Sequence, residues 1–277
     1  REGLTQHWWP NGNPRSIETY LNGKPHGEAK GWHKDGKLAR TEKYEAGQKV
    51  GTSEGWWKNG NRHDSTTFFN GKPNGWQVKW FDSGRTNSVV FFVNGTKHGP
   101  STTWHLNGQK SQHLVFVKGK PHGDMIEWHP NGQQKALEKY VNGVQHGQGA
   151  GWFENGKVDW QGNWLNGQRQ GIFVRYHPNG VRKLQIDYNA GILRRKTSFN
   201  EQERVTEDIV VPSGRTVHWP VERLTNLIKN KKQIADLFGR PGKVVGNVWT
   251  YSGIYVIRDH KIQQTSIRIS FDPSGQC

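Results

Sequence analysis

The sequence predicts a mainly β protein: a long open antiparallel meander of eight 24-residue hairpin repeats over residues 1–196, followed by a small α+β domain. Three observations lead to this prediction. Aromatic residues recur every 24 residues, and Asn-Gly dipeptides mark two turns per period. The composition has 35 Gly and 14 Trp but only 31% hydrophobic residues and one Met. A helical bundle needs periodic aliphatic stripes, and a disordered chain carries few aromatic residues, so both are disfavoured.

Aromatic and glycine columns define the repeat. The first aromatic column comprises Trp8, Trp32, Trp56, Trp80, Trp104, Trp128, Trp152 and Tyr176, each followed four residues later by glycine. The second comprises Tyr20, Tyr44, Phe68, Phe92, Phe116, Tyr140, Trp164 and Tyr188, each followed three residues later by glycine. A third glycine column runs from Gly27 to Gly171, and Arg195 stands in its place in the eighth repeat. Stacked repeats can therefore share one continuous aromatic seam.

The Asn-Gly dipeptides predict the turns. Asn-Gly between β-prone runs is a strong hairpin signal, because both residues tolerate a positive φ. Two turns in each period leave room for about sixteen strands of roughly six to eight residues. We therefore expect an extended, single-layer meander.

The repeat resembles the bacterial variant of the MORN repeat. The similarity rests on Tyr20-Leu-Asn-Gly-Lys-Pro-His-Gly27 and Phe116-Val-Lys-Gly-Lys-Pro-His-Gly123, each preceded by a Trp-x-x-x-Gly half. It covers residues 1–196 and implies an all-β ribbon that binds proteins or lipids and has no catalytic activity. Many bacterial proteins that carry this variant are classed as antitoxins or immunity proteins, so the resemblance implies a toxin as partner.

The period ends after residue 196, and a different region follows. Residues 197–219 predict a capping hairpin or linker, because terminal units of repeat arrays need a cap. Val221 to Phe238 predicts a helix that Gly239 and Pro241 terminate. Val244 to Ile257 and Lys261 to Phe271 predict two strands. Residues 220–277 resemble the small α+β domain of the BamE/SmpA outer-membrane lipoproteins, through Leu237-Phe-Gly-Arg-Pro241 and Val248-Trp-Thr-Tyr251.

A second stripe of side chains lies next to the first aromatic column. Strand alternation directs it to the opposite face of the sheet. Its richness in Trp, Phe and His is typical of an interaction surface, although both faces could also pack locally. The candidate partner-binding residues are Trp9, His33, Trp57, Phe81, His105, His129, Phe153 and His177.

Neither the histidines nor the acidic residues predict catalysis or metal binding. In the column of His26, His98, His122 and His146, the closest successive members are two strands apart, about 9.6 Å, too far to share one zinc ion. We expect these histidines to bond backbone groups beside the turns. The sequence also contains no nucleophile elbow, P-loop, dinucleotide fingerprint or zinc-protease motif. We therefore predict a non-enzyme with no catalytic residues, no metal and no cofactor.

The net charge of +16 indicates an acidic partner. Residues 1–196 hold 28 basic and 15 acidic side chains, but no basic cluster is interleaved with stacking aromatics, so nucleic acid is disfavoured. The predicted function is that of an immunity or antitoxin protein that sterically blocks a secreted bacterial toxin, for example a phospholipase-type effector. The alternatives are a basic scaffold on an anionic membrane and an envelope-assembly factor. The C-terminal resemblance favours the periplasm or cell envelope over the cytoplasm, and numbering from Arg1 is consistent with a removed leader.

Overall fold

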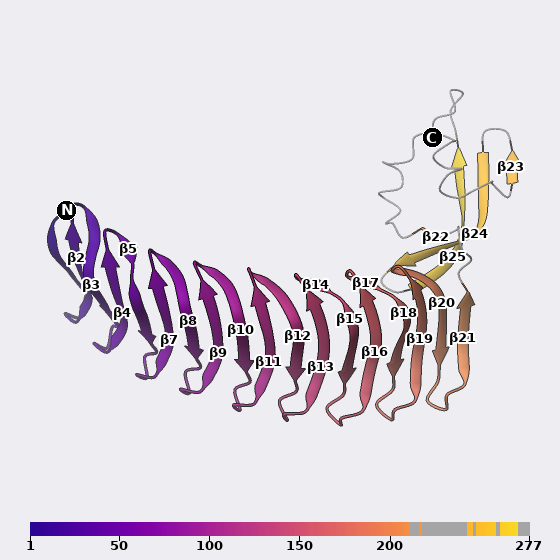
Figure 1. Ribbon diagram of the computed structural model, residues 1–277, viewed down its shortest axis with the longest axis horizontal. Helices are drawn as coiled ribbons and strands as arrows, with labels where there is room; N and C mark the ends of the chain where they lie inside the picture. Colours follow the sequence, from indigo (N-terminus) through magenta and orange to yellow (C-terminus); the bar gives the residue numbers. More distant parts are fainter. Residues whose placement is uncertain (211–215, 218–242, 246–247, 259–260, 271–277) are drawn as a thin grey trace. The chain divides into compact units, whose positions relative to one another are not determined.

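A computed structural model describes residues 1–210, 216–217, 243–245, 248–258 and 261–270 (Figure 1). The chain divides into two compact units, Arg1–Gly167 and Gln168–Cys277. Strands β1 to β21 belong to one 21-stranded sheet, in which the pairs with defined register are antiparallel and join strands that are close in sequence. The prediction of a long open antiparallel meander of hairpin repeats is therefore confirmed.

The first unit is a single layer of strands that lie side by side (Figure 1). Its strands are β1 (Gly3–Trp8), β2 (Pro14–Leu21), β3 (Lys24–Trp32), β4 (Leu38–Glu45), β5 (Gln48–Lys49), β6 (Gly51–Trp56), β7 (Arg62–Phe69), β8 (Lys72–Trp80), β9 (Thr86–Val93), β10 (Thr96–Trp104), β11 (Lys110–Val117), β12 (Lys120–Trp128), β13 (Gln134–Val141), β14 (Val144–Gln145), β15 (Gly147–Trp152) and β16 (Val158–Leu165).

The second unit contains the end of this sheet and a separate small sheet. The large-sheet strands are β17 (Gln168–Arg169), β18 (Gly171–Tyr176), β19 (Arg182–Asn189), β20 (Ile192–Phe199) and β21 (Val205–Val210). The small sheet has four strands, β22 (Thr216–Val217), β23 (Lys243–Val245), β24 (Val248–Arg258) and β25 (Lys261–Ser270), and β24 pairs with the other three. The predicted helix from Val221 to Phe238 lies outside the described residues.

One of the two turns in each repeat has the predicted conformation. Asn22 and Gly23 have φ values of 51° and 75°, and the equivalent pairs up to Ala190 and Gly191 also have positive φ at both positions. This is the two-residue turn that matches the twist of antiparallel strands. The turn glycine also donates its N–H to a carbonyl of the preceding repeat, as in Gly47 N to Pro25 O at 2.8 Å. The turns therefore connect strands within a repeat and link neighbouring repeats.

The other Asn-Gly turn differs from the expectation. Gly12 has a φ of 85°, but Asn11 does not have a positive φ. The loop is closed by Gly12 N to Trp9 O at 2.9 Å and by Trp9 N to Asn13 O at 2.8 Å. The Asn11 side chain instead accepts from Asn13 N and donates to Lys34 O in the next repeat. Asparagine is thus useful here for its amide group, which joins two repeats.

The third glycine column forms a bulge in each repeat. Gly27, Gly99 and Gly123 have φ values from 81° to 84°, and the register shifts beside these glycines. The histidine before each glycine accepts a backbone N–H from the next turn through Nδ1, from Ala46, Lys118 and Asn142 at 3.4–3.5 Å. For these histidines, the expected backbone-bonding role is confirmed.

The second aromatic column forms a ladder with the residues paired to it. Lys49 lies over the rings of Tyr44 and Phe68, at 5.9 and 5.4 Å, and so joins two repeats by cation–π contacts. Tyr140 donates its hydroxyl to Glu138 at 2.8 Å. Burial and this hydrogen bond raise the pKa of Tyr140 to about 12, so the phenol remains a neutral donor. The ladder supplies the buried apolar surface that aliphatic side chains supply in other folds.

The array continues past the predicted end of the repeats at residue 196. Strand β20 crosses that position and pairs with β21 around a ninth turn, closed by Glu203 N to Asn200 O at 3.0 Å. In the eighth repeat the bulge is one residue shorter, because Asp187 pairs with Arg195 and Tyr188 with Leu193. Phe199 therefore follows Tyr176 by 23 residues instead of 24.

Candidate interaction surface

The predicted stripe occupies the position directly after the first aromatic column, three residues before the turn glycine, and is half-buried throughout. Its members contact the next repeat. Most of them donate a ring N–H to the backbone carbonyl of an aromatic residue in that repeat. These bonds are Trp9 to Trp32, His33 to Trp56, Trp57 to Trp80, His105 to Trp128, His129 to Trp152 and His177 to Phe199, at 2.7–3.4 Å. Phe81 and Phe153 have no such donor. The stripe therefore holds neighbouring repeats together, and its role in partner binding stays a prediction.

Exchanging histidine and phenylalanine within the stripe should change stability in opposite directions. His105→Phe removes the bond to Trp128 O and should lower the free energy of unfolding by about 1 kcal/mol. Phe81→His should add the equivalent bond and raise it by a similar amount. Both residue types already occupy this column, so neither change should alter packing much. Urea unfolding would measure both effects, and equal stability of the two variants would contradict the bonding role.

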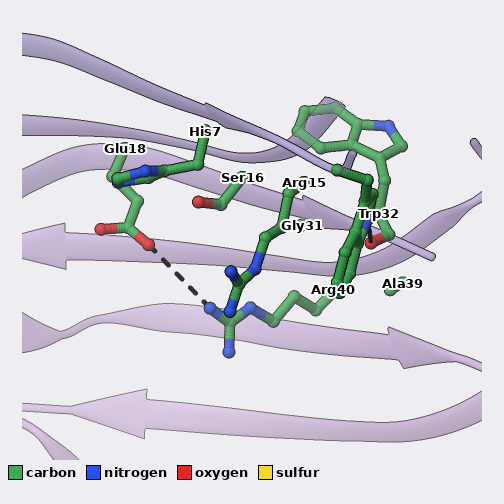
Figure 2. A pocket seen from close by; sticks show the side chains of 9 residues that line it. His7, Arg15, Ser16, Glu18, Gly31, Trp32, Ala39 and Arg40 are labelled. Carbon is green, nitrogen blue, oxygen red and sulfur yellow. Dashed lines mark hydrogen bonds and ion pairs between the residues drawn. The ribbon is translucent and has the colours of Figure 1, made fainter. Parts of the chain in front are cut away.

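Hollows form on this face at equivalent places in the array. One, of about 490 Å³, is lined by His7, Trp9, Arg15, Ser16, Glu18, Gly31, Trp32, Ala39 and Arg40 (Figure 2). Another, of about 380 Å³, is lined by Thr103, His105, Ser111, Gln112, Glu127, Trp128, His129, Pro130 and Lys135. They lie four repeats apart, and most of their lining positions correspond, for example Trp9 with His105 and Gly31 with Glu127. These two places in the array thus present corresponding hollows with different chemistry.

The opposite face carries an apolar patch in which five exposed side chains surround the half-buried Phe91. We define the apolar patch as Phe69, Trp76, Phe91, Val93, Val115 and Val117. Strand alternation and register direct all six to one face, and Trp76 pairs directly with Phe91. Their rings meet edge to face at a centroid distance of 5.0 Å. Phe69 is 57% exposed and Trp76 is 47% exposed. Large rings that remain accessible beside exposed valines are typical of a protein-binding surface.

The apolar patch was not predicted, although the sequence contains a signal for it. In the column of Phe91, the first three repeats carry Thr19, Lys43 and Thr67. In the column of Trp76, the two preceding repeats carry Glu28 and Thr52. The column of Phe91 is apolar only at Phe91 and Val115, in the middle of the array, and is polar again from Lys139 onward. Such departures from a repeat mark function better than its constant columns, which serve the fold.

The segment that carries the apolar patch is strongly basic. Between residues 65 and 123 the basic residues are Lys72, Lys79, Arg85, Lys97, Lys110, Lys118 and Lys120, and the acidic residue is Asp82. Seven positive charges and one negative charge give this segment a net charge of +6. Lys72 pairs with Phe69 and Lys120 with Val117, so lysines border the apolar patch. This arrangement complements an apolar surface bordered by carboxylates.

Within the described part of the chain, no three His, Cys, Asp or Glu side chains are grouped so that they could hold a metal ion. No helix among the described residues is long and apolar enough to cross a membrane.

Comparisons with known proteins match three segments of the chain to one family. The family described as the MORN repeat variant matches residues 1–22, 25–46 and 169–190. No curated protein matches the chain. Among solved structures, TcdB2-TccC3 is 12% identical over 99% of this chain and 17% of that chain, with a TM-score of 0.21. The same assembly without its hypervariable C-terminal region is 12% identical over 90% and 15%, also with a TM-score of 0.21.

This chain spans less than a fifth of those solved chains, and at these TM-scores the likeness informs neither fold nor function. The matched segments fall in the first, second and eighth repeats, and the repeats between them carry the same aromatic and glycine columns. Three of the repeats therefore match the MORN repeat variant.

Proposed function

We propose that this chain is a non-enzymatic protein-binding module that engages its partner through the apolar patch. The observation that carries the proposal is the contact between Trp76 and Phe91 on an exposed sheet face, in columns that are polar in the first two repeats. Clustered aromatic side chains supply most of the binding energy at protein interfaces. A sheet held by many backbone bonds between repeats also loses little conformational entropy on docking.

The partner that fits this surface has an apolar centre surrounded by acidic side chains. Such charge complementarity speeds encounter and disfavours basic partners. We propose a bacterial toxin or effector as the partner, which the module would inhibit by covering its working surface. The choice of a toxin rests on the resemblance to antitoxin and immunity proteins.

A matched pair of variants tests the apolar patch. Trp76→Thr with Phe91→Thr gives the patch the residues found at Thr52 and Thr67, so the fold should tolerate both changes. We expect binding of a co-purified partner to weaken by at least about 30-fold, as for loss of a hot spot. The control, Phe81→His, changes the other face and should bind normally. Titration calorimetry measures the affinities, and melting temperatures check folding.

The possible results separate the candidate functions. Loss of partner affinity in the double-threonine variant with normal binding by the control supports the proposal. Unchanged affinity in the double-threonine variant would overturn it. If the wild-type chain instead sediments with anionic lipid vesicles at low salt and the double-threonine variant does not, the apolar patch serves a membrane surface and the protein-binding proposal fails.

A further inference from the structure

The two hollows differ at several lining positions, and one of these differences concerns a carboxylate. In the hollow of the fifth and sixth repeats, Glu127 forms an ion pair with Lys135 at 3.1 Å and accepts a hydrogen bond from Gln112 at 3.2 Å. The equivalent position in the first and second repeats is Gly31. The larger hollow therefore has no carboxylate at this position, and Glu18 supplies its carboxylate from another position.

Gly31 also affects the position of the Arg40 side chain. A Cβ atom at position 31 would lie 3.1 Å from both Cγ and Nε of Arg40. The absence of a side chain at residue 31 therefore lets Arg40 lie close across the strand at this point, and a larger residue would displace it. Figure 2 shows the guanidinium group of Arg40 reaching the same part of the hollow as that of Arg15.

The positive charges in this hollow exceed the negative charge available to them. Glu18 approaches Arg40 at 4.0 Å, and its other carboxylate oxygen accepts the hydroxyl hydrogen bond of Tyr20 at 2.9 Å. Arg15 lies over the ring of Trp9, 4.9 Å from its centroid, and forms no ion pair with any residue whose side chain the structure describes. Lys34 lies over the same ring at 5.4 Å. Two guanidinium groups thus line a hollow with a single carboxylate.

We propose that this hollow binds one external oxyanion, a carboxylate or phosphate group, between Arg15 and Arg40. The bound group would take the place that the Glu127 carboxylate has in the equivalent hollow. Planar guanidinium groups bind both kinds of anion through paired hydrogen bonds, and contact with Trp9 already restrains the Arg15 side chain. Ser16 also lines the hollow and provides a hydroxyl donor. This site lies on the face opposite the apolar patch, so it does not depend on the proposed function.

The site can be tested with inorganic phosphate and with acetate as probes, titrated at constant ionic strength. The indole N–H of Trp9, which donates to Trp32 O, reports binding in ¹⁵N–¹H correlation spectra. We expect a saturable shift of this signal in the wild-type chain. Arg15→Ser with Arg40→Gln installs residues that the array already carries at Ser111 and Gln112, and should weaken binding at least tenfold.

Two further variants control for charge and for folding. Arg85→Gln removes one positive charge elsewhere, at a position where the next repeat has Gln109, and should bind normally. Gly31→Glu retains both arginines but supplies an internal carboxylate, as at Glu127, and should lose binding. Tighter binding of phosphate would assign a phosphate ligand, and tighter binding of acetate would assign a carboxylate. No saturable shift with either probe, or equal affinity in the double variant, would overturn the proposal.

Discussion

Replacing Gly151 with valine should lower the free energy of unfolding by about 3 kcal/mol, the upper part of the range for an overpacked site. Gly151 pairs with Trp160 on the neighbouring strand. A Cβ atom at position 151 would collide with three atoms of the Trp160 indole. That ring has little room to retreat, because Trp164 packs against it edge to face at 5.6 Å. Thermal unfolding should show a decrease of roughly 5–10 °C in the melting temperature.

The same substitution at Gly31 is the matched control. Gly31 and Gly151 occupy one column of the repeat, and neither has a positive φ. A Cβ atom at Gly31 would meet only the flexible side chain of Arg40, which can move into solvent. Valine also suits a strand, so Gly31→Val should cost less than about 1 kcal/mol. Equal losses at the two positions would show that the Trp160 ring is not the cause.

Most of the fold could be predicted from the sequence because its determinants are local and periodic. The turn from Asn22 to Gly23 depends on two adjacent residues that accept positive φ. The ladder through Tyr44 and Phe68 depends on residues one period apart. The sequence predicts a capping hairpin or linker at residues 197–219, but not that β20 and β21 continue the array. The shorter bulge after Tyr188 shifts the phase by one residue, and the strict 24-residue period ends there. A fixed spacing of 24 residues cannot locate an aromatic residue that such a bulge has moved by one position.

The surfaces could be predicted less well from the sequence. Constant columns hold the repeats together, whereas variable columns form the surface features that occur once. The stripe from Trp9 to His177 recurs in every repeat, and its ring N–H groups bond the next repeat. The aromatic pair of Trp76 and Phe91 occurs once in the array, where the column of Phe91 changes from polar to apolar. The pair of arginines in the first hollow also occurs once. Recognising either feature requires the cross-strand register, which tells which variable positions share a face.

Shortening Ile186 to alanine should cost about 3–4 kcal/mol, the range for a large buried aliphatic side chain that leaves a cavity. Ile186 is 2% exposed and pairs with Phe173 on β18 and with Lys196 on β20. Tyr188 and Leu193 in the same unit are also buried. Leu165→Ala is the control, since Leu165 is 48% exposed and its truncation should cost less than about 0.5 kcal/mol.

The loss caused by Ile186→Ala should also be local. Each repeat contacts mainly its neighbours, so the stability of an array is close to a sum of repeat and interface contributions. Hydrogen exchange should therefore accelerate first in β18, β19 and β20, while the amides of β7 to β12 keep their wild-type protection. An equal loss of protection in all these strands would mean that the whole sheet unfolds as one cooperative unit. In that case the ladders and the turn hydrogen bonds would couple distant repeats as strongly as adjacent ones.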